Sequence, residues 1–321
     1  MTRTLATARQ RPEISVVIPC YNEEENAQAI IAAATAQLES LGIEDFEIVL
    51  IDNASTDRTV ELIREVCARD RRVKLIVNSR NFGQMRSPTH AIFQTSGKAV
   101  IGLCADFQDP PELIPELIAG WREGYDIVLG IRSAERVGFL HRQLRALSYW
   151  LAQNFGDHPV VPQATGFGLY SRRAVDYTRE LAEPEPFFRG MLVETGFAIK
   201  AIPYARPPRA AGASKNNFLA LLDFAMSALS GSSKRLLRAP IYIGVFGMLM
   251  AGLMLLGGVI AFFAGRPIAA WLIGAVVQFE FALLFGLLGL LGDNLRIVSE
   301  RTRRTPLVIE KERINFAPED H

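Results

Sequence analysis

Two long apolar runs in the last third of the chain set the first limit on its fold. No charged residue occurs from Ile241 to Phe263, and a second apolar run extends from Ile268 to Leu291. An α-helix rises ~1.5 Å per residue, so each run can cross the ~30 Å hydrocarbon layer of a membrane. The break at 264–267 leaves room only for a tight turn. We predict a two-helix transmembrane hairpin over 240–292; a helical pair buried in a soluble core is the alternative.

Basic residues around these runs predict the orientation. Only Arg266 lies in the turn, whereas several basic residues flank the two outer ends of the hairpin: Lys234, Arg235, Arg238, Arg296, Arg301, Arg303 and Arg304. Because cytoplasmic flanks carry the excess of Lys and Arg, we expect a two-pass protein of a bacterial plasma membrane with both chain ends in the cytoplasm. Residues 216–239 then form an interfacial helix or a plain linker helix, and 293–321 form a cytoplasmic tail.

One acidic residue, Glu280, lies near the middle of the second run. A carboxylate at that depth is costly and usually faces a partner or a wet cavity. Two interpretations stay open: a helix–helix contact within a homo-oligomer, or a neutral, protonated glutamate with no special role.

Charge and cysteine usage exclude several classes of protein. The formal net charge of +1 provides no attraction of the whole chain to nucleic acid. The three cysteines, Cys20, Cys67 and Cys104, follow neither CxxC nor zinc-site spacing, so we expect a reduced compartment without disulfides. Residues 1–12 lack the apolar core of a signal peptide and are expected to be a flexible N-terminus.

Residues 13–215 alternate between short apolar, β-branched runs and helical patterns. The expected strands are 14–18, 46–51, 73–77, 99–103 and 127–131, and the helices between them are 24–41, about 59–68 and a segment ending near 95. This order is typical of an α/β domain with a doubly wound, mostly parallel sheet and right-handed crossovers. In such sheets a ligand lies outside the carboxyl ends of the strands.

Polar and acidic residues follow each of the first four expected strands. These segments are Pro19–Glu24, Asp52–Asp57, Asn78–Asn81 and Cys104–Pro111. Neither GxGxxG after the first strand nor GxxxxGK[ST] anywhere is present, which argues against dinucleotide and P-loop sites. The four segments predict a nucleotide site at one edge of the sheet.

Carboxylates that face a diphosphate indicate a hard divalent cation with oxygen ligands, Mg²⁺ or Mn²⁺. Asp106 and Gln108 are spaced to present oxygens on one side of a strand end. Asp109 precedes Pro110 and Pro111, and proline in a first turn is a helix-start signal. Asp109 is therefore either a helix cap or a ligand.

These segments together resemble a known family of enzymes. Four of them, 17–24, 51–57, 79–83 and 105–112, resemble the family 2 glycosyltransferases of GT-A fold. Phe188–Gly190, Arg209–Lys215, the two apolar runs and Arg303–Pro306 are similar to the polyprenyl-phosphate branch, which includes dolichol-phosphate mannose synthases and bactoprenol glucosyltransferases. The resemblance covers nearly the whole chain from Ile14 on.

The resemblance implies a role for individual residues. Nucleotide-sugar binding would fall to Pro19, Tyr21, Glu23, Asp52, Cys104 and Ala105, and the metal to Asp106 and Gln108. The residues assigned to the acceptor phosphate are Arg132, Arg189, Arg209 and Ser214, and those assigned to catalysis are Asp106, Arg132 and Lys215. Other roles stay open: Asp52 could form an Asx turn, Asp106 could be a cap, and Arg132 could pair with Glu135. Likewise Arg189 could pair with Glu194, and Arg209 and Lys215 could bind headgroups.

Three segments depart from the family pattern. Cys104 stands at the first place of the family's Asp-X-Asp, and a neutral thiol is a poor ligand for magnesium. Gly166 and Gly168 replace the acid and the base of Asp-Phe-Arg-Leu, and the basic acceptor helix is altered at Phe139–Arg145. The departures indicate a divergent subgroup with a changed sugar or acceptor, or loss of activity.

The function that follows is transfer of one sugar from a UDP- or GDP-linked donor to undecaprenyl or another polyprenyl phosphate, with inversion at the anomeric carbon. A phosphate acceptor is already anionic and needs no strong general base. Two alternatives stay open. A processive polysaccharide synthase would normally show Gln-X-X-Arg-Trp and more membrane spans, and a silent nucleotide-sugar-binding scaffold would fit Cys104 and Gly166.

Overall fold

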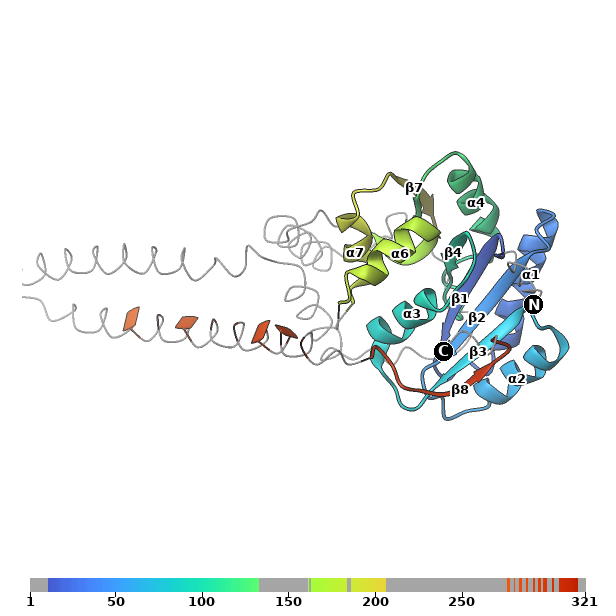
Figure 1. The fold of residues 1–321 in the computed structure, drawn as a ribbon, viewed down its shortest axis with the longest axis horizontal. Helices are drawn as coiled ribbons and strands as arrows, with labels where there is room; N and C mark the ends of the chain where they lie inside the picture. Colours follow the sequence, from blue (N-terminus) through green and yellow to red (C-terminus); the bar gives the residue numbers. More distant parts are fainter. Residues whose placement is uncertain are drawn as a thin grey trace, which may run out of the picture. The chain divides into compact units, whose positions relative to one another are not determined.

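The computed structural model describes residues 11–132, 161, 163–183, 186–205 and 306–316, together with single positions between 276 and 302. The chain divides into two compact units. The first combines Met1–Leu144, Val160–Asn217 and Arg304–His321, and the second combines Arg145–Pro159 and Phe218–Arg303. All the strands that the structure describes belong to the first unit, and Figure 1 shows their arrangement.

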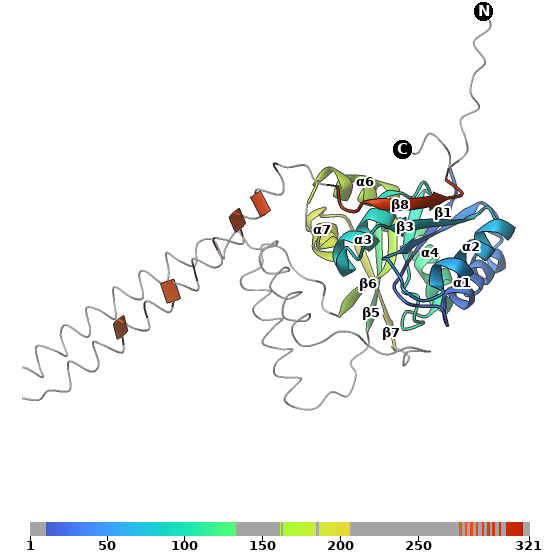
Figure 2. The ribbon, with the colours of Figure 1, turned by 90° about the horizontal axis from the view of Figure 1, so that it is seen from below.

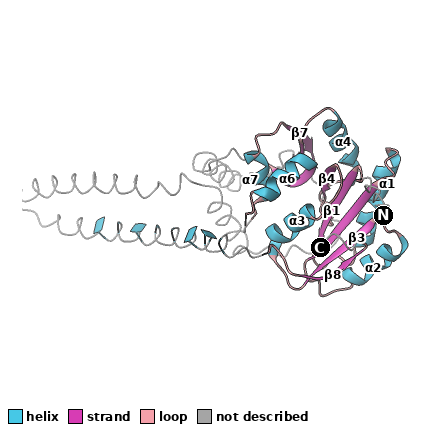
Figure 3. Ribbon diagram, viewed as in Figure 1, coloured by secondary structure: helices cyan, strands magenta, loops and turns pink. Residues whose placement is uncertain are grey.

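An eight-stranded sheet forms the centre of the first unit, and Figure 3 shows its strands in magenta. The strand order is β7-β5-β6-β4-β1-β2-β3-β8. The strands are β1 Ile14–Cys20, β2 Phe46–Asp52, β3 Val73–Asn78, β4 Ala99–Gly102, β5 Ile127–Arg132, β6 Ala164–Ser171, β7 Ile199–Tyr204 and β8 Glu310–Ile314. Every pairing is parallel except those of β6 and β8, which run against their neighbours. The predicted doubly wound, mostly parallel sheet is confirmed.

Helices cover both faces of this sheet, as Figure 2 shows. One face carries α1 Ala27–Ser40, α2 Thr59–Arg69 and α4 Ile114–Arg122, which follows the 3₁₀ turn η1 Pro111–Leu113. The other face carries α3 Gly83–Phe93, α6 Arg172–Glu180 and α7 Phe188–Glu194. Because strand side chains alternate between faces, the continuous apolar runs of β1 and β2 supply both cores.

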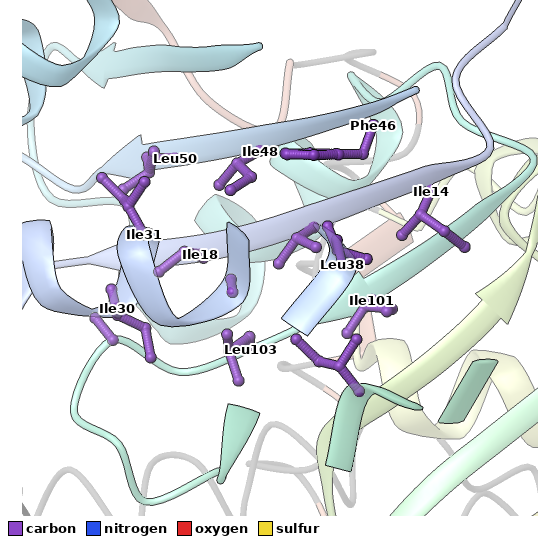
Figure 4. Packing of buried hydrophobic residues seen from close by; sticks show 14 of the residues in the cluster. Ile14, Ile18, Ile30, Ile31, Leu38, Phe46, Ile48, Leu50, Ile101 and Leu103 are labelled. Atoms are coloured by element: carbon purple, nitrogen blue, oxygen red, sulfur yellow. The ribbon is translucent and has the colours of Figure 1, made fainter. Parts of the chain in front are cut away.

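The core between β1, β2 and helix α1 shows this alternation (Figure 4). Ile14 and Ile18 of β1 pack on the same side as Ile30 and Leu38 of α1, and all four are fully buried. Val17 of β1 packs into the opposite core. In parallel register Ile14 lies beside Phe46, and Cys20 lies beside Asp52. The ends of β1 and β2 therefore reach the same edge of the sheet.

The segment expected to be a tail contains β8, and this expectation needs correction. Its side chains are mostly charged, so the sequence lacks a strand signal, but tertiary contacts hold it against β3. Asn315 donates to the carbonyls of Cys67 and Val73, both at 2.8 Å, and Arg86 donates to the carbonyl of Pro306 at 2.8 Å. The domain expected over 13–215 is completed by residues from beyond the apolar runs.

The expected membrane hairpin lies outside the described residues apart from single positions. Among the described residues, no helix is both long and apolar enough to cross a membrane. The interfacial helix over 216–239, the N-terminus over 1–10 and the altered segment 139–145 also lie outside the described part.

Candidate active site

The segments predicted to form the site meet at the edge where the parallel strands end. After β1, β2, β3 and β4 come 21–26, 53–58, 79–82 and 103–110. Three of these connections contain a non-glycine residue in the left-handed region: Asn22 with φ 55°, Ala54 with φ 63° and Phe107 with φ 59°. Such conformations cost free energy and concentrate at functional sites.

Hydrogen bonds join the first two loops of this edge. The Asn22 amide donates to Ser55 Oγ at 2.8 Å, and Asn22 Oδ1 accepts from the Thr56 amide at 2.8 Å. The Glu23 amide donates to Thr59 Oγ1 at 2.8 Å. The carbonyl of Glu23 accepts from the amides of Asn26 and Ala27, which explains why α1 starts later than the sequence pattern predicts. The two loops form one rigid wall.

Asp52 forms the base of this wall and is fully buried. Its Oδ2 accepts from the Ser55 amide at 2.9 Å, and its Oδ1 accepts from Ser55 Oγ. Burial raises the pKa of Asp52, although the hydrogen bonds from Ser55 oppose this effect. The Asx-turn interpretation is therefore correct, and any contact with a nucleotide would come in addition to it. Pro19 and Tyr21 flank the same position, and Tyr21 is 40% exposed.

Asn53 connects the second and third loops, and the sequence analysis did not single it out. Its Nδ2 donates to Asn81 Oδ1 at 2.9 Å and to the Gly83 carbonyl at 3.2 Å. Its Oδ1 accepts from the Phe82 amide at 2.9 Å and from Asn78 Nδ2 at 3.1 Å. One amide thus fixes the end of β3 and the start of α3. The only signal in the sequence is its place directly after Asp52.

The proposed metal-binding residues lie on the loop after β4. Asp106 is 7% exposed, and its Oδ1 accepts from the Gln108 amide at 3.1 Å. Cys104 is exposed at the start of the loop, and Ala105 is buried. Phe107, in the left-handed region, lies between Asp106 and Gln108 in the turn that brings the Gln108 amide to the Asp106 carboxylate.

Asp109 does not cap a helix, so that interpretation is wrong. The residue before the following 3₁₀ turn is Pro110, and no side chain caps this turn. Asp109 is instead 2% exposed, and its Oδ1 accepts from the Tyr204 hydroxyl at 2.8 Å. Burial raises the pKa of Tyr204 to about 12, with the Asp109 charge adding to this shift.

The predicted acceptor-side residues are only partly described. Arg132 ends β5 and also hydrogen-bonds the Tyr204 hydroxyl. Arg189 of α7 donates to the carbonyl of Ala164 at 2.5 Å and lies over the Phe187 ring. Arg209, Ser214 and Lys215, as well as Glu135, lie outside the described residues. The described part of the chain thus brings Arg132 to the acidic edge, and it places Arg189 against the start of β6.

Gly166 and Gly168, which stand where the family pattern has an acid and a base, are required by the structure for different reasons. Gly166 has φ +96°, a conformation that L-residues rarely adopt. A Cβ at Gly168 would lie 2.5 Å from the Val128 carbonyl oxygen, closer than real contacts allow. The acid and the base of the family pattern would therefore both require a changed β6 backbone.

The oxygen atoms of Asp106 and Gln108 fit a divalent cation that arrives with a diphosphate. Among the described residues, no group of three or more His, Cys, Asp and Glu side chains could hold a metal alone. Asp106 and Gln108 supply oxygens, and Mg²⁺ commonly binds one or two carboxylates plus substrate phosphates. The described residues therefore fit a cation shared with a diphosphate better than a cation held by protein side chains alone.

Comparison with known families identifies the class of protein. The model of "Glycosyl transferase family 2" matches residues 15–178, which include every strand end described above from β1 to β5. The chain belongs to this family and is a glycosyltransferase, as the motifs predict.

Full-length relatives support the resemblance further. "Bactoprenol glucosyl transferase" of Shigella phage SfX is 31% identical over 308 residues, 94% of this chain and 99% of that protein. "Uncharacterized glycosyltransferase YkcC" of Bacillus subtilis (strain 168) is 31% identical over 307 residues, covering 92% and 93%. The solved structure of glucosyl-3-phosphoglycerate synthase from Mycobacterium tuberculosis with Mn²⁺, UDP and glucosyl-3-phosphoglycerate is similar at TM-score 0.48 and 20% identity, covering 69% and 80%.

Proposed function

We propose that this glycosyltransferase moves a single sugar from a nucleotide-sugar donor to a polyprenyl phosphate. The observation that carries the proposal is the extent of the match with the bactoprenol glucosyl transferases. It covers 94% of the chain, whereas the family model stops at residue 178. The match therefore includes the segment with the two apolar runs, which a transferase with a soluble acceptor would not need.

The described edge supplies groups suited to a nucleotide-sugar donor. Asp52 and the wall of loops around Asn22 and Asn53 offer a rigid surface for the base and ribose. Asp106 and Gln108 would hold Mg²⁺ or Mn²⁺, and the cation would neutralise charge on a leaving diphosphate. Arg132 would add a fixed positive charge beside it. Pre-formed groups of this kind act without reorganisation when the charge develops.

A phosphate acceptor does not require the protein to supply a general base. A lipid phosphate is anionic at neutral pH, so its oxygen attacks without a general base. Direct displacement by that oxygen inverts the anomeric carbon and converts an α-linked donor into a β-linked product. Arg132 and Arg189, with Arg209, Ser214 and Lys215, are the proposed contacts to the acceptor phosphate.

Membrane attachment is part of the same proposal. The apolar runs at 241–263 and 268–291 would anchor the chain in the bacterial plasma membrane, and their basic flanks favour a catalytic domain on the cytoplasmic side. Cytosolic nucleotide sugars and the headgroup of the lipid would then meet at one surface. A homo-oligomer stays a prediction.

Turnover by the purified full chain tests the proposal. The protein in lipid nanodiscs would receive labelled UDP- or GDP-sugars, undecaprenyl phosphate and Mg²⁺, with extracted lipid and polymer analysed separately. We expect one sugar per lipid, and loss of transfer in Asp106→Asn without unfolding. Asp176→Asn, a surface carboxylate on α6, serves as the matched control.

Other outcomes of this experiment would refute the proposal. A polymer would indicate a processive synthase. Donor binding without turnover would indicate a silent scaffold, the function that exposed Cys104 at the first acidic position of the motif favours. Unchanged turnover in Asp106→Asn would contradict the metal assignment.

A further inference from the structure

The hydroxyl of Tyr204 connects two parts of the site that lie far apart in the sequence. Tyr204 ends β7, and Asp109, 95 residues earlier, lies in the loop after β4. In the sheet, β5 and β6 lie between these two strands. The Tyr204 side chain and the loop after β4 therefore meet at the ends of the strands between them, where the Tyr204 hydroxyl lies 2.8 Å from Asp109 Oδ1.

Packing fixes the direction of this ring. The Phe167 and Tyr204 rings meet edge to face, with centroids 5.5 Å apart. Both lie over Gly130 of β5, where an added Cβ would be 2.6 Å from Phe167 Cδ1 and 3.1 Å from Tyr204 Cε1. Glycine at this position makes room for the two rings, so the place of the hydroxyl is set by the sheet itself.

The hydrogen bonds at this hydroxyl have a defined direction. A phenol has one proton, and the Asp109 carboxylate can only accept it. Arg132, which can only donate, hydrogen-bonds the same oxygen, and Thr165 Oγ1 lies 3.5 Å away. The order is therefore from the Arg132 guanidinium to Tyr204 and from Tyr204 to Asp109.

The two residues on either side of the Tyr204 hydroxyl each have one buried atom without a hydrogen-bond partner among the described residues. They are Nε of Arg132 and Oδ2 of Asp109. A buried charged group that is only partly satisfied opposes folding, and native proteins retain few such groups without a functional reason. Stability alone thus does not account for a cation and a carboxylate on opposite sides of one phenol.

We propose that Tyr204 is a positioning residue that holds Arg132 at a fixed place relative to the loop of Asp106 and Gln108. The inference rests on the proposed function, in which Arg132 faces the leaving diphosphate. Asp109 belongs to the same loop as Asp106, so the Tyr204–Asp109 bond sets the position of the arginine against the metal-binding oxygens.

Tyr204→Phe removes the hydroxyl and keeps the ring that packs on Phe167. Because charge on the diphosphate grows toward the transition state, we expect kcat to fall roughly 10- to 100-fold while KM for the donor changes little. The affinity for UDP and the thermal midpoint should stay close to those of the parent. Tyr125→Phe, two residues before β5 and away from the acidic edge, is the matched control and should retain full kcat.

A double-mutant cycle with Arg132→Gln decides whether Tyr204 acts through the arginine. We expect Tyr204→Phe to cause little further loss in the Arg132→Gln background, because the positioned group is gone. If the two losses multiply instead, the inference is overturned. Should Tyr204→Phe fail to fold, Asp109→Asn enters the same cycle with the same expectation, since the amide keeps the size but not the charge.

Sugar transfer by the parent protein shows whether a failed test refutes this inference or the proposed function. If it transfers no sugar to undecaprenyl phosphate, the proposed function is wrong. If it does transfer sugar and the losses multiply, only the role of Tyr204 is refuted.

Discussion

Nε2 of His90 on α3 lies 2.6 Å from Oε1 of Glu310 in β8, although the two residues are 220 positions apart. Arg313 also binds Glu310, at 2.6 Å and 2.8 Å to its two oxygens, and donates to Gln94, directly after α3, at 2.9 Å. These contacts attach β8, the last strand in the chain, to helix α3 and to the residue that follows it.

Glu310→Gln should weaken the attachment of β8 at neutral pH. Burial raises the pKa of Glu310, but the hydrogen bonds from His90 and Arg313 outweigh it and bring the pKa to about 2. A carboxyl with a depressed pKa stabilises the fold above its unfolded pKa of about 4.3, and this contribution disappears as the pH falls toward the folded value. We expect a loss of about 1 to 3 kcal/mol at pH 7 that shrinks between pH 4 and 2, roughly the interval between the two pKa values.

Hydrogen exchange of the amides of 310–314 measures this effect in the full chain. Glu312→Gln, which breaks the exposed pair with Arg64, is the control and should change protection by less than about 1 kcal/mol. Equal exchange in Glu310→Gln and the parent at pH 7 would refute the prediction.

Asn53→Asp should disturb donor binding without changing the shape of residue 53. The carboxylate cannot donate to Asn81 Oδ1 or to the Gly83 carbonyl, and it places negative charge beside both acceptors. Leaving these groups unsatisfied should cost about 1 to 3 kcal/mol and raise the Kd for UDP roughly 10-fold. Calorimetry with UDP is the measurement, with Gln28→Glu on the exposed face of α1 as control. An unchanged Kd would show that the third loop has no part in the donor site.

Lys74→Met should be the most destabilising of these changes. Glu47 is 2% exposed, and its oxygens accept from Lys74 Nζ at 2.6 Å, Ser15 Oγ at 2.6 Å and the Ser96 amide at 2.6 Å. Removing the lysine leaves a buried carboxylate without its counter-ion, which costs about 3 to 5 kcal/mol.

Thermal unfolding should therefore show a much lower midpoint for Lys74→Met than for Lys98→Met, a surface control. Adding Glu47→Gln to Lys74→Met should recover part of the loss, because the unpaired charge is removed. No recovery in the double variant would mean that packing of the lysine stem, rather than charge, carries the effect.

Cys104→Asp should reduce the concentration of Mg²⁺ needed for half-maximal turnover. Cys104 is exposed on the loop of Asp106, so an added carboxylate meets no steric obstacle and supplies a hard oxygen ligand. We expect a shift of roughly 3- to 10-fold, on the order of 1 kcal/mol. A Mg²⁺ titration of activity measures it, and Cys104→Ser should leave the midpoint near that of the parent. An identical titration for the aspartate variant would exclude residue 104 from the metal site.

The sequence was a good guide where local pattern and tertiary structure agree. Strands β1 to β5 are short β-branched runs between turn signals, and their predicted bounds differ from the observed ones by one or two residues. The acidic edge followed from their parallel order, because residues after parallel strands must meet.

Other features were not visible because they depend on contacts between distant segments. β6 contains Gly166 and Gly168, which weaken any strand pattern, and β8 is charged and pairs with a strand far back in the chain. The Asp109–Tyr204 bond joins residues 95 positions apart, so no local spacing could predict it. Asn53 has the same property, since its four partners lie between the end of β3 and the start of α3.

The pairing of β8 with β3 also constrains how the protein is made. A ribosome releases β3 early, but its outer edge finds a partner only after residues 310–314 have been synthesised. Until then the nascent domain exposes a row of backbone amides and carbonyls, which is a template for wrong pairing. Completion of the sheet therefore waits for residues that follow the apolar runs, and a truncation directly after these runs would leave the outer edge of β3 unpaired.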